Sequence, residues 1–106
     1  MARNLVKLSF NSALVLGAIG AGYSYGFDIM DATGLASGMV YPTLRRLEQQ
    51  QLIKSSWEEE PVAFAEQRPA RKYYRVTHAG RGALAGAVQR FGLLTELPRM
   101  ESSQRR

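Results

Sequence analysis

The feature that most constrains this chain is a helical segment that contains a proline, GMVYPTLRRLEQQQLI, from Gly38 to Ile53. Apolar residues recur in it at helical spacing, at Val40, Leu44 and Leu47, and strong helix formers fill most other positions. A proline in a helix interior removes a backbone hydrogen bond and costs roughly 3 kcal/mol, so Pro42 has to be explained by its place in the helix.

Pro42 is expected on the exposed side of this helix and close to its start. Steps of about 100° per residue from a buried Leu44 turn Pro42 to the opposite side. If Ser37 is the N-cap, Pro42 lies just past the N–H groups that have no helical partner, so a loose or bent first turn is expected. In the alternative, the helix begins at Thr43 and Tyr41 packs in the core.

The pattern of the whole chain is helix, helix, helix, strand, loop, strand, helix. Helices are expected over residues 5–20, 26–32, 37–50 and 78–97, and strands over 52–57 and 71–77, around the loop EEEPVAFAEQRPA. This order predicts a mostly α fold with a small β-hairpin, a winged helix-turn-helix, whose third helix enters the DNA major groove while the hairpin (the wing) follows the backbone. Residues 1–77 would form the DNA-binding domain, 78–98 a dimerisation helix and 99–106 a polar, disordered tail.

Composition narrows the function classes. The chain has 106 residues, no cysteine and one histidine, His78, which excludes a disulfide framework, a thiolate zinc site and any pair of histidines at a metal. No paired acids lie in an apolar setting that would suit acid–base catalysis. We therefore expect that the protein is not an enzyme and that it binds no metal ion and no cofactor. The net charge of +5 favours an anionic partner such as nucleic acid.

The N-terminus resembles a targeting signal, because Arg3 and Lys7 precede the apolar run ALVLGAIGAG over residues 13–22. The favoured interpretation is a buried or amphipathic first helix. The run is shorter than the stretch of about 20 apolar residues that spans a bilayer. No membrane partner is expected, and a DNA-binding protein of this kind would work in the cytoplasm, at the nucleoid.

Two regions are expected to contact DNA. The blunt start of the third helix can approach base edges, and its arginines lie at phosphate or guanine range. The stretch from residue 68 to 81, which covers the second strand and the start of the last helix, has basic residues and no acid. This suits a backbone-tracking wing, although it could also be a merely solvated face. The residues expected at DNA are Ser37, Gly38, Met39, Tyr41, Pro42, Arg45, Arg46, Arg68, Arg71 and Lys72.

The last helix carries more apolar surface than one short domain needs. One stripe comprises Leu84, Ala87, Val88, Phe91 and Leu94, and a second face carries Leu93 and Leu97. The second face suggests a partner chain. Alternatively, both faces belong to the core of one monomer.

Three segments together resemble the signature of the PadR family of bacterial transcriptional regulators: YGFDI over 25–29, GMVYPTLRRLEQQQLI over 38–53 and RKYYRVTHAGRGAL over 71–84. The resemblance implies a winged-helix DNA-binding repressor and a homodimer made through the last and first helices. The expected interface residues are Leu5, Leu8, Phe91, Leu93, Leu94 and Leu97. Many members respond to a small aromatic ligand in the dimer interface, and Phe91 is the nearest substitute for a tryptophan found there in some of them.

Two departures from the family pattern stand out. Gln51 occupies a position after the third helix where glycine is usual, and a non-glycine residue loses roughly 1 kcal/mol in the left-handed conformation expected there. The wing is also longer, and its three consecutive glutamates, Glu58, Glu59 and Glu60, are expected to be solvated and turned away from DNA.

Two functions remain open on the sequence. The favoured one is a dimeric repressor that recognises an inverted-repeat operator in double-stranded DNA. The alternative is a winged-helix module that contacts another protein or RNA through its basic face.

Overall fold

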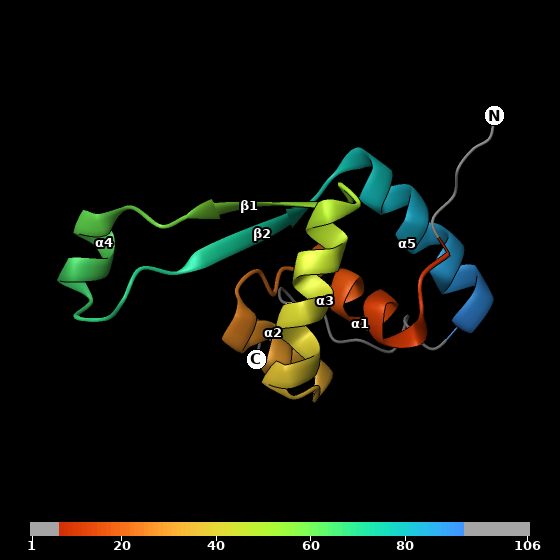
Figure 1. Ribbon diagram of the computed structural model, residues 1–106, viewed down its shortest axis with the longest axis horizontal. Helices are drawn as coiled ribbons and strands as arrows, with labels where there is room; N and C mark the ends of the chain where they lie inside the picture. Colours follow the sequence, from red (N-terminus) through yellow and green to blue (C-terminus); the bar gives the residue numbers. More distant parts are fainter. Residues whose placement is uncertain (1–6, 93–106) are drawn as a thin grey trace, which may run out of the picture.

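A computed structural model describes residues 7–92 and shows a helical body from which a hairpin projects (Figure 1). The elements in chain order are α1 (Phe10–Gly20), α2 (Gly26–Thr33), α3 (Ser37–Gln49), β1 (Ile53–Trp57), α4 (Glu60–Ala65), β2 (Lys72–Val76) and α5 (His78–Phe91). The predicted winged helix-turn-helix, mostly α with a two-stranded hairpin, is confirmed.

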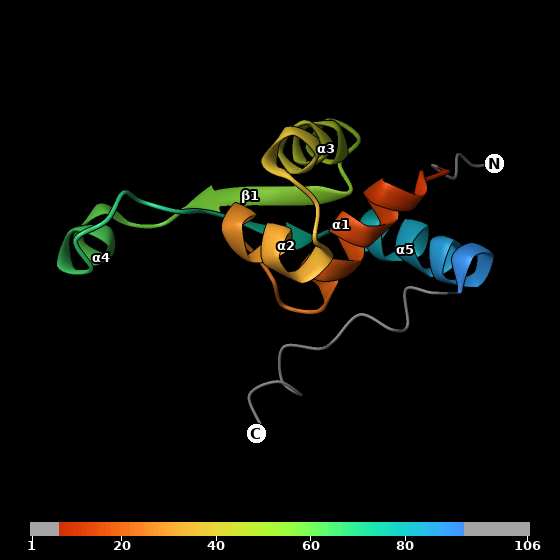
Figure 2. The ribbon, with the colours of Figure 1, turned by 90° about the horizontal axis from the view of Figure 1, so that it is seen from below.

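Helix α1 lies at the centre of the body and packs against α2, α3, α5 and β2 (Figure 2). Its side chains Val15 and Leu16 are fully buried, together with Ile29 from α2 and Leu44 from α3. Ala87 of α5 is also fully buried in this cluster, so α5 completes the core of the chain whatever else it contacts. Within the part of the chain that the structure describes, no helix is long and apolar enough to cross a membrane.

The first helix begins later than predicted. Ser9 is its N-cap, and the Ser9 hydroxyl accepts a hydrogen bond from the Ser12 N–H at 3.1 Å. Leu8 precedes this cap and is only 5% exposed, inside the core. Leu8 was expected at a dimer interface; because its side chain is already buried within one chain, that placement is wrong. Leu5 lies outside the described residues.

Helix α3 differs from the prediction at its start. Ala36, not Ser37, is the N-cap, and the N–H groups of Met39 and Val40 both donate to the Ala36 carbonyl at 2.9 Å. This shared acceptor tightens the first turn, which was expected to be loose or bent. Pro42 lies inside a continuous helix, so the alternative of a helix that starts at Thr43 is also wrong.

The predicted left-handed end of α3 is confirmed, since Gln51 has φ 62°. The Gln51 N–H donates to the Glu48 carbonyl at 2.9 Å, and the Leu52 N–H donates to the Leu47 carbonyl at 3.0 Å. This is the Schellman arrangement, in which an apolar contact usually joins the two outer residues. Leu47 and Leu52 are indeed both buried.

Strands β1 and β2 pair antiparallel, with Ile53 opposite Val76 and Trp57 opposite Lys72. Both strands are within one residue of the predicted bounds at each end. An isolated bridge that the sequence did not predict joins Tyr25 to Tyr73, where the Tyr74 N–H donates to the Ser24 carbonyl at 2.7 Å. The segment before α2 is thereby fixed to the wing.

The segment between the strands was expected to be a loop, and this is wrong, because residues 60–65 form helix α4 at the tip of the wing. Pro61 lies in its first turn, where a missing N–H costs no helical bond. Gln67 then adopts φ 58°, and the Arg68 N–H donates back to the Ala63 carbonyl at 3.2 Å. The wing therefore ends in a small folded unit.

Helix α5 starts as predicted. Thr77 caps it and accepts a hydrogen bond from the Gly80 N–H at 3.0 Å. A Cβ on Gly80 would lie 2.0 Å from the Leu52 carbonyl oxygen, so only glycine allows this close approach. The helix ends at Phe91, before the predicted Leu97. The expected interface residues Leu93, Leu94 and Leu97 lie outside the described residues.

Candidate nucleic-acid interface

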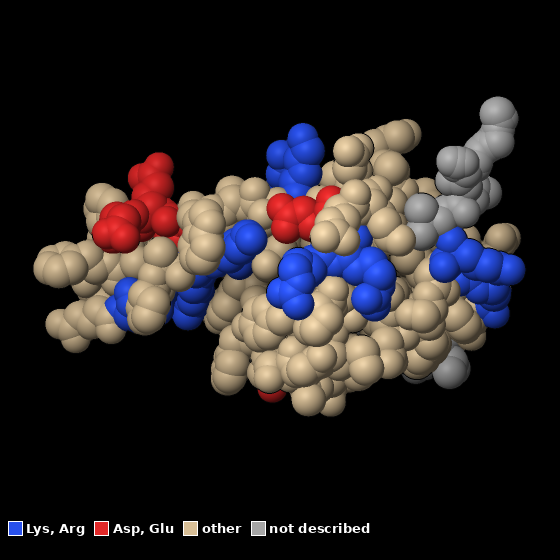
Figure 3. Space-filling view, viewed as in Figure 1, with Lys and Arg blue, Asp and Glu red and all other residues tan. Residues whose placement is uncertain are grey.

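Basic side chains lie over α3 and along the hairpin, whereas acidic side chains gather at the tip of the wing (Figure 3). On α3, the core side is made by Val40, Leu44 and Leu47. The other side is open to solvent, and Arg45 and Arg46 are both exposed on it. Helix α3 therefore has an apolar side in the core and a basic side that is free to contact a polyanion.

The start of α3 offers the surface that the sequence predicted. Ser37, Gly38 and Met39 are exposed, and Tyr41 is 43% exposed. Pro42 is half-buried rather than fully exposed. The structure thus brings the predicted helix residues onto one accessible end of α3.

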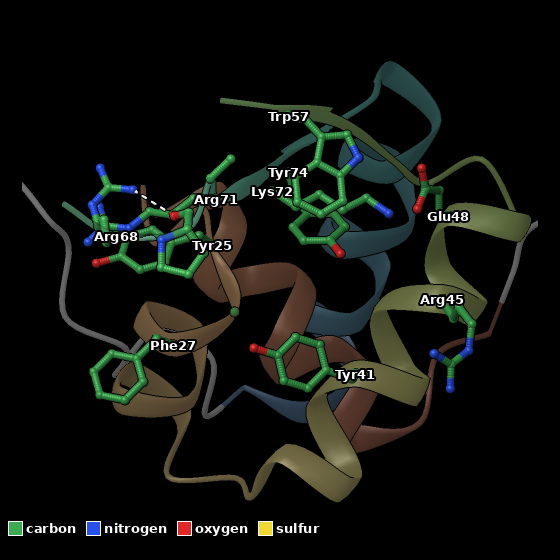
Figure 4. Close-up of a pocket in the computed structure, with 13 residues that line it drawn as sticks. Tyr25, Phe27, Tyr41, Arg45, Glu48, Trp57, Arg68, Arg71, Lys72 and Tyr74 are labelled. Carbon is green, nitrogen blue, oxygen red and sulfur yellow. Dashed lines mark hydrogen bonds between the residues drawn. The ribbon is translucent and has the colours of Figure 1, made fainter. Parts of the chain in front are cut away.

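Tyr41 also has a structural role that the sequence did not reveal. A Cβ on Gly26 would lie 2.2 Å from the Tyr41 hydroxyl oxygen and 2.6 Å from the adjacent ring carbon. The Tyr41 ring therefore lies directly against the start of α2, with its hydroxyl turned toward the position of Gly26 (Figure 4). This contact fixes the spacing of the two helices of the helix-turn-helix.

Arg68 was expected at DNA, but in the structure it is held by Glu58. Its guanidinium donates to both Glu58 carboxylate oxygens, at 2.6 and 2.9 Å, and the Glu58 side chain is 8% exposed. The hydrogen bonds from Arg68 lower the pKa of Glu58 to about 2, and the same contact raises the pKa of Arg68. Arg68 therefore serves the wing itself, and a phosphate would have to compete with a carboxylate for it.

Glu58 does more than pair with Arg68. It also accepts hydrogen bonds from the Arg71 N–H at 3.2 Å and from the Tyr73 hydroxyl at 3.5 Å. The sequence analysis placed Glu58 in a solvated acidic run, because the run gives no sign that its first member faces the opposite strand. We call Glu58 and Arg68 the wing clamp, since they join the chain just before α4 to the chain just after it.

Arg71 and Lys72 remain available to an anion. The Arg71 guanidinium lies 4.1 Å from the centre of the Tyr25 ring, and the Lys72 ammonium lies 5.7 Å from that of Trp57. A hydrogen bond with Tyr73 is the main cause that raises the pKa of Arg71. Over residues 7–92, neither cation forms a salt bridge.

A groove of about 810 Å³ lies between the start of α2, α3 and the hairpin (Figure 4). Aromatic rings and cations line most of it, and Phe27 and Arg45 stand at its outer edges. Tyr74, whose pKa is raised by burial, lies beside Trp57 and faces Tyr41 across the open space. The lining residues are Tyr25, Gly26, Phe27, Tyr41, Arg45, Glu48, Trp57, Arg68, Pro69, Ala70, Arg71, Lys72 and Tyr74. We call this the wing groove.

No group of His, Cys, Asp and Glu side chains in the described residues is arranged to hold a metal ion.

A helix-turn-helix with a basic exposed face, followed by a wing, defines the winged-helix class of DNA-binding proteins. Within that class, the chain belongs to the PadR-like family of transcriptional regulators, whose family model matches residues 15–86. This is a family of regulators rather than of enzymes. No curated protein matches the sequence at a significant level.

Solved structures agree with this assignment. A PadR family transcription regulator from Clostridium difficile is similar at 25% identity and a TM-score of 0.69, over 83% of this chain and 93% of that one. A PadR-like transcription factor from Bacteroides fragilis is similar at 26% identity and a TM-score of 0.64, over 80% of this chain and 82% of that one. The Bordetella bronchiseptica protein BpsR, whose DNA binding is regulated by 6-hydroxynicotinic acid, shares the fold at 22% identity and a TM-score of 0.65, over 85% of this chain and 64% of that one.

Proposed function

We propose that this protein is a dimeric repressor of the PadR type that recognises an inverted-repeat operator in double-stranded DNA. The observation that carries the proposal is the exposed, basic side of α3, where Arg45 and Arg46 follow the accessible helix start. In this proposal, α3 enters the major groove, and one of these arginines reads a guanine while the other contacts phosphate.

The hairpin would lie along the DNA backbone. Arg71 and Lys72, which form no salt bridge in the described part of the chain, are the wing cations proposed to contact phosphates. Their stacking on aromatic rings holds them in place without neutralising their charge. Arg68 contributes indirectly, through the wing clamp.

We propose the division of the chain into a DNA-binding part over residues 1–77, a dimerisation helix over 78–98 and a polar tail over 99–106. Near the end of α5, Phe91 packs edge-to-face on Phe10 at 5.1 Å between ring centres, and Phe10 stays 38% exposed. The Arg90 guanidinium donates to the Leu8 carbonyl at 2.7 Å, which ties α5 to the start of the chain. The proposed interface comprises Leu5, Phe91, Leu93, Leu94 and Leu97.

A small aromatic effector is proposed as a further partner, by analogy with the regulation of BpsR by 6-hydroxynicotinic acid. A repressor of this kind would act at the nucleoid in the bacterial cytoplasm.

Selection of bound duplexes from a random DNA pool tests the proposal. The expected product is an inverted repeat whose half-sites are about one helical turn apart, because the two α3 helices of a dimer meet the same side of the duplex. Enrichment of a single unrepeated site would contradict the dimeric reading. If the protein enriches no duplex but binds RNA or another protein instead, the alternative of a module for protein or RNA contact is favoured.

A further inference from the structure

The tip of the wing has exposed apolar side chains and a negative charge, and the proposed DNA binding uses neither of them. Phe64 is 86% exposed and Val62 is 48% exposed, which is unusual for large apolar side chains that have no partner. Glu59, Glu60 and Glu66 surround them and are all exposed. An acidic surface is repelled by phosphates, so the tip is not built to lie on DNA.

The tip is also held in a fixed position. The wing clamp of Glu58 and Arg68 closes the chain at the base of α4, and Ala63 of α4 is 4% exposed. A surface that is ordered before binding loses less conformational entropy when it meets a partner. The exposed Phe64 is therefore presented by a formed element rather than by a loose loop.

The wing groove has the complementary properties. Its walls include the rings of Tyr25, Tyr41 and Trp57, and Lys72 supplies a positive charge that no carboxylate within residues 7–92 neutralises at salt-bridge distance. An aromatic side chain flanked by glutamates complements the aromatic lining of such a groove and its cations Arg45, Arg71 and Lys72, which outnumber the single lining acid, Glu48. Within residues 7–92, the tip of a wing thus has the exposed aromatic and acidic side chains that complement the wing groove.

Within one molecule the tip does not occupy the groove, because Phe64 is 86% exposed and is not among the residues that line it. The groove lies between the outer end of the strands, where Trp57 pairs with Lys72, and the starts of α2 and α3, whereas α4 projects beyond the strands, away from the helical body (Figure 1). Two wings that run antiparallel side by side would, however, place each tip at the groove of the other chain.

We propose that two copies of this chain exchange wing tips, so that Phe64 of each enters the wing groove of the other, with Glu60 and Glu66 against its cations. The contact is self-complementary about a two-fold axis, the usual symmetry of such pairs. It is weakened by salt, because its charge pairs lie near the surface. Since the groove lies on the proposed DNA-binding face, the tip competes with DNA. This consequence, unlike the contact itself, rests on the proposed function.

The full chain offers a direct test, because it has a single tryptophan, Trp57 in the groove, and no cysteine. A nitroxide is attached to a Val62→Cys copy and mixed with ¹⁵N-labelled copies, whose Trp57 indole gives one NMR signal. Only a tip from another molecule can then broaden that signal. We expect more than half of its intensity to be lost at about 0.2 mM protein, and recovered when the nitroxide is reduced. Full intensity at this concentration would overturn the proposal.

Charge reversal identifies the contact. A tip variant, Glu60→Lys with Glu66→Lys, should lose the effect on its own, and so should a groove variant, Arg45→Glu with Lys72→Glu. A mixture of the labelled tip variant with the ¹⁵N groove variant should restore it, because both contacts in that pair are again complementary. Phe64→Ser, which removes an exposed side chain, should abolish the effect in the native background. If broadening persists in each variant alone, the tip does not occupy the groove.

Addition of duplex DNA separates this proposal from the proposed function. If DNA binds the same face, the Trp57 signal should return as the duplex is added. A tip contact that passes the charge-reversal test but ignores DNA would retain the wing exchange and contradict the placement of DNA in the groove.

Discussion

At the scale of single residues, two close contacts set the positions of whole helices. Gly80 allows α5 to approach the Leu52 carbonyl, and Gly26 allows Tyr41 to lie against the start of α2. At Gly80 a Cβ would overlap the backbone of Leu52, and at Gly26 it would overlap the ring of Tyr41. The absence of a side chain is what permits the helices to come together.

Gly26→Ala should therefore destabilise the protein. The new Cβ would lie 2.2 Å from the Tyr41 hydroxyl oxygen, so the ring must move, and overpacking of this kind costs about 1–3 kcal/mol. Thermal or urea unfolding measures the change. Gly38→Ala is the matched control, because nothing lies within 4 Å of its Cβ and alanine favours the helix. Equal stability of both variants would show that Tyr41 adapts freely.

A second residue-scale prediction concerns the left-handed end of α3. Gln51→Gly should stabilise the domain by about 1 kcal/mol, because glycine adopts φ 62° without the Cβ penalty that glutamine bears. Gln50→Gly, one residue earlier at φ −82°, should give no such gain. Thermal melts that show destabilisation at Gln51 would mean that its side chain makes a contact worth more than the strain.

At the scale of elements, the wing is an almost separate piece of structure. It has its own helix, α4, and its own polar closure, the wing clamp, while its strands join it to the body through β2 and the bridge at Tyr25. Helix α3, by contrast, is held by a buried apolar side and leaves its other side free. The proposed DNA interface thus combines a rigid helix with a hairpin whose geometry depends on polar contacts.

The wing clamp should respond to acid. The pKa of Glu58 is lowered from 4.5 to about 2, so its stabilising effect is complete above pH 4.5 and is lost as the pH falls toward 2. A ¹³C NMR titration of the Glu58 carboxyl should give a midpoint near 2. In Arg68→Gln the midpoint should return toward 4.5, because the chief cause of the shift is removed. An unchanged midpoint in that variant would show that Arg68 is not the cause.

Helix α3 gives the prediction for DNA. Arg45→Ala or Arg46→Ala should weaken specific binding by about 1–3 kcal/mol where the arginine reads a guanine. Where it contacts only phosphate, the loss should be equal on all sequences, and the salt slope should fall by about 1. Arg81→Ala, on exposed α5 surface, is the control and should change little. Unaltered affinity of both α3 variants would exclude this helix from the groove of DNA.

At the scale of the whole molecule, acidic side chains gather at the wing tip, whereas the surface over α3 and along the hairpin is mostly basic (Figure 3). The body presents α3 and the wing groove to an anion, and α5 lies on α1 away from the wing (Figure 1). A dimer formed through α5 would leave both DNA-binding faces accessible. Linking two half-sites in this way multiplies affinity through effective concentration.

The dimer prediction is a double change, Leu93→Asp with Leu97→Asp. Two charges in an apolar contact cost more than they can recover, so the variant should be monomeric by light scattering and lose operator binding while it keeps its helical circular dichroism. Ala85→Asp with Gln89→Asp, both exposed on α5, is the matched control and should stay dimeric. A dimer that persists in the first variant would move the interface away from this segment.

The sequence by itself determined the order of all elements except α4, because helical and strand periodicities, the cap at Thr77 and the left-handed Gln51 are local properties of neighbouring residues. It also indicated the basic side of α3, which follows from spacing along one helix. Only the tertiary structure decided the use of Glu58, Arg68 and Leu8. Their partners lie on other segments, and no local pattern reports whether a charge meets its partner across a hairpin or an apolar residue meets its own core.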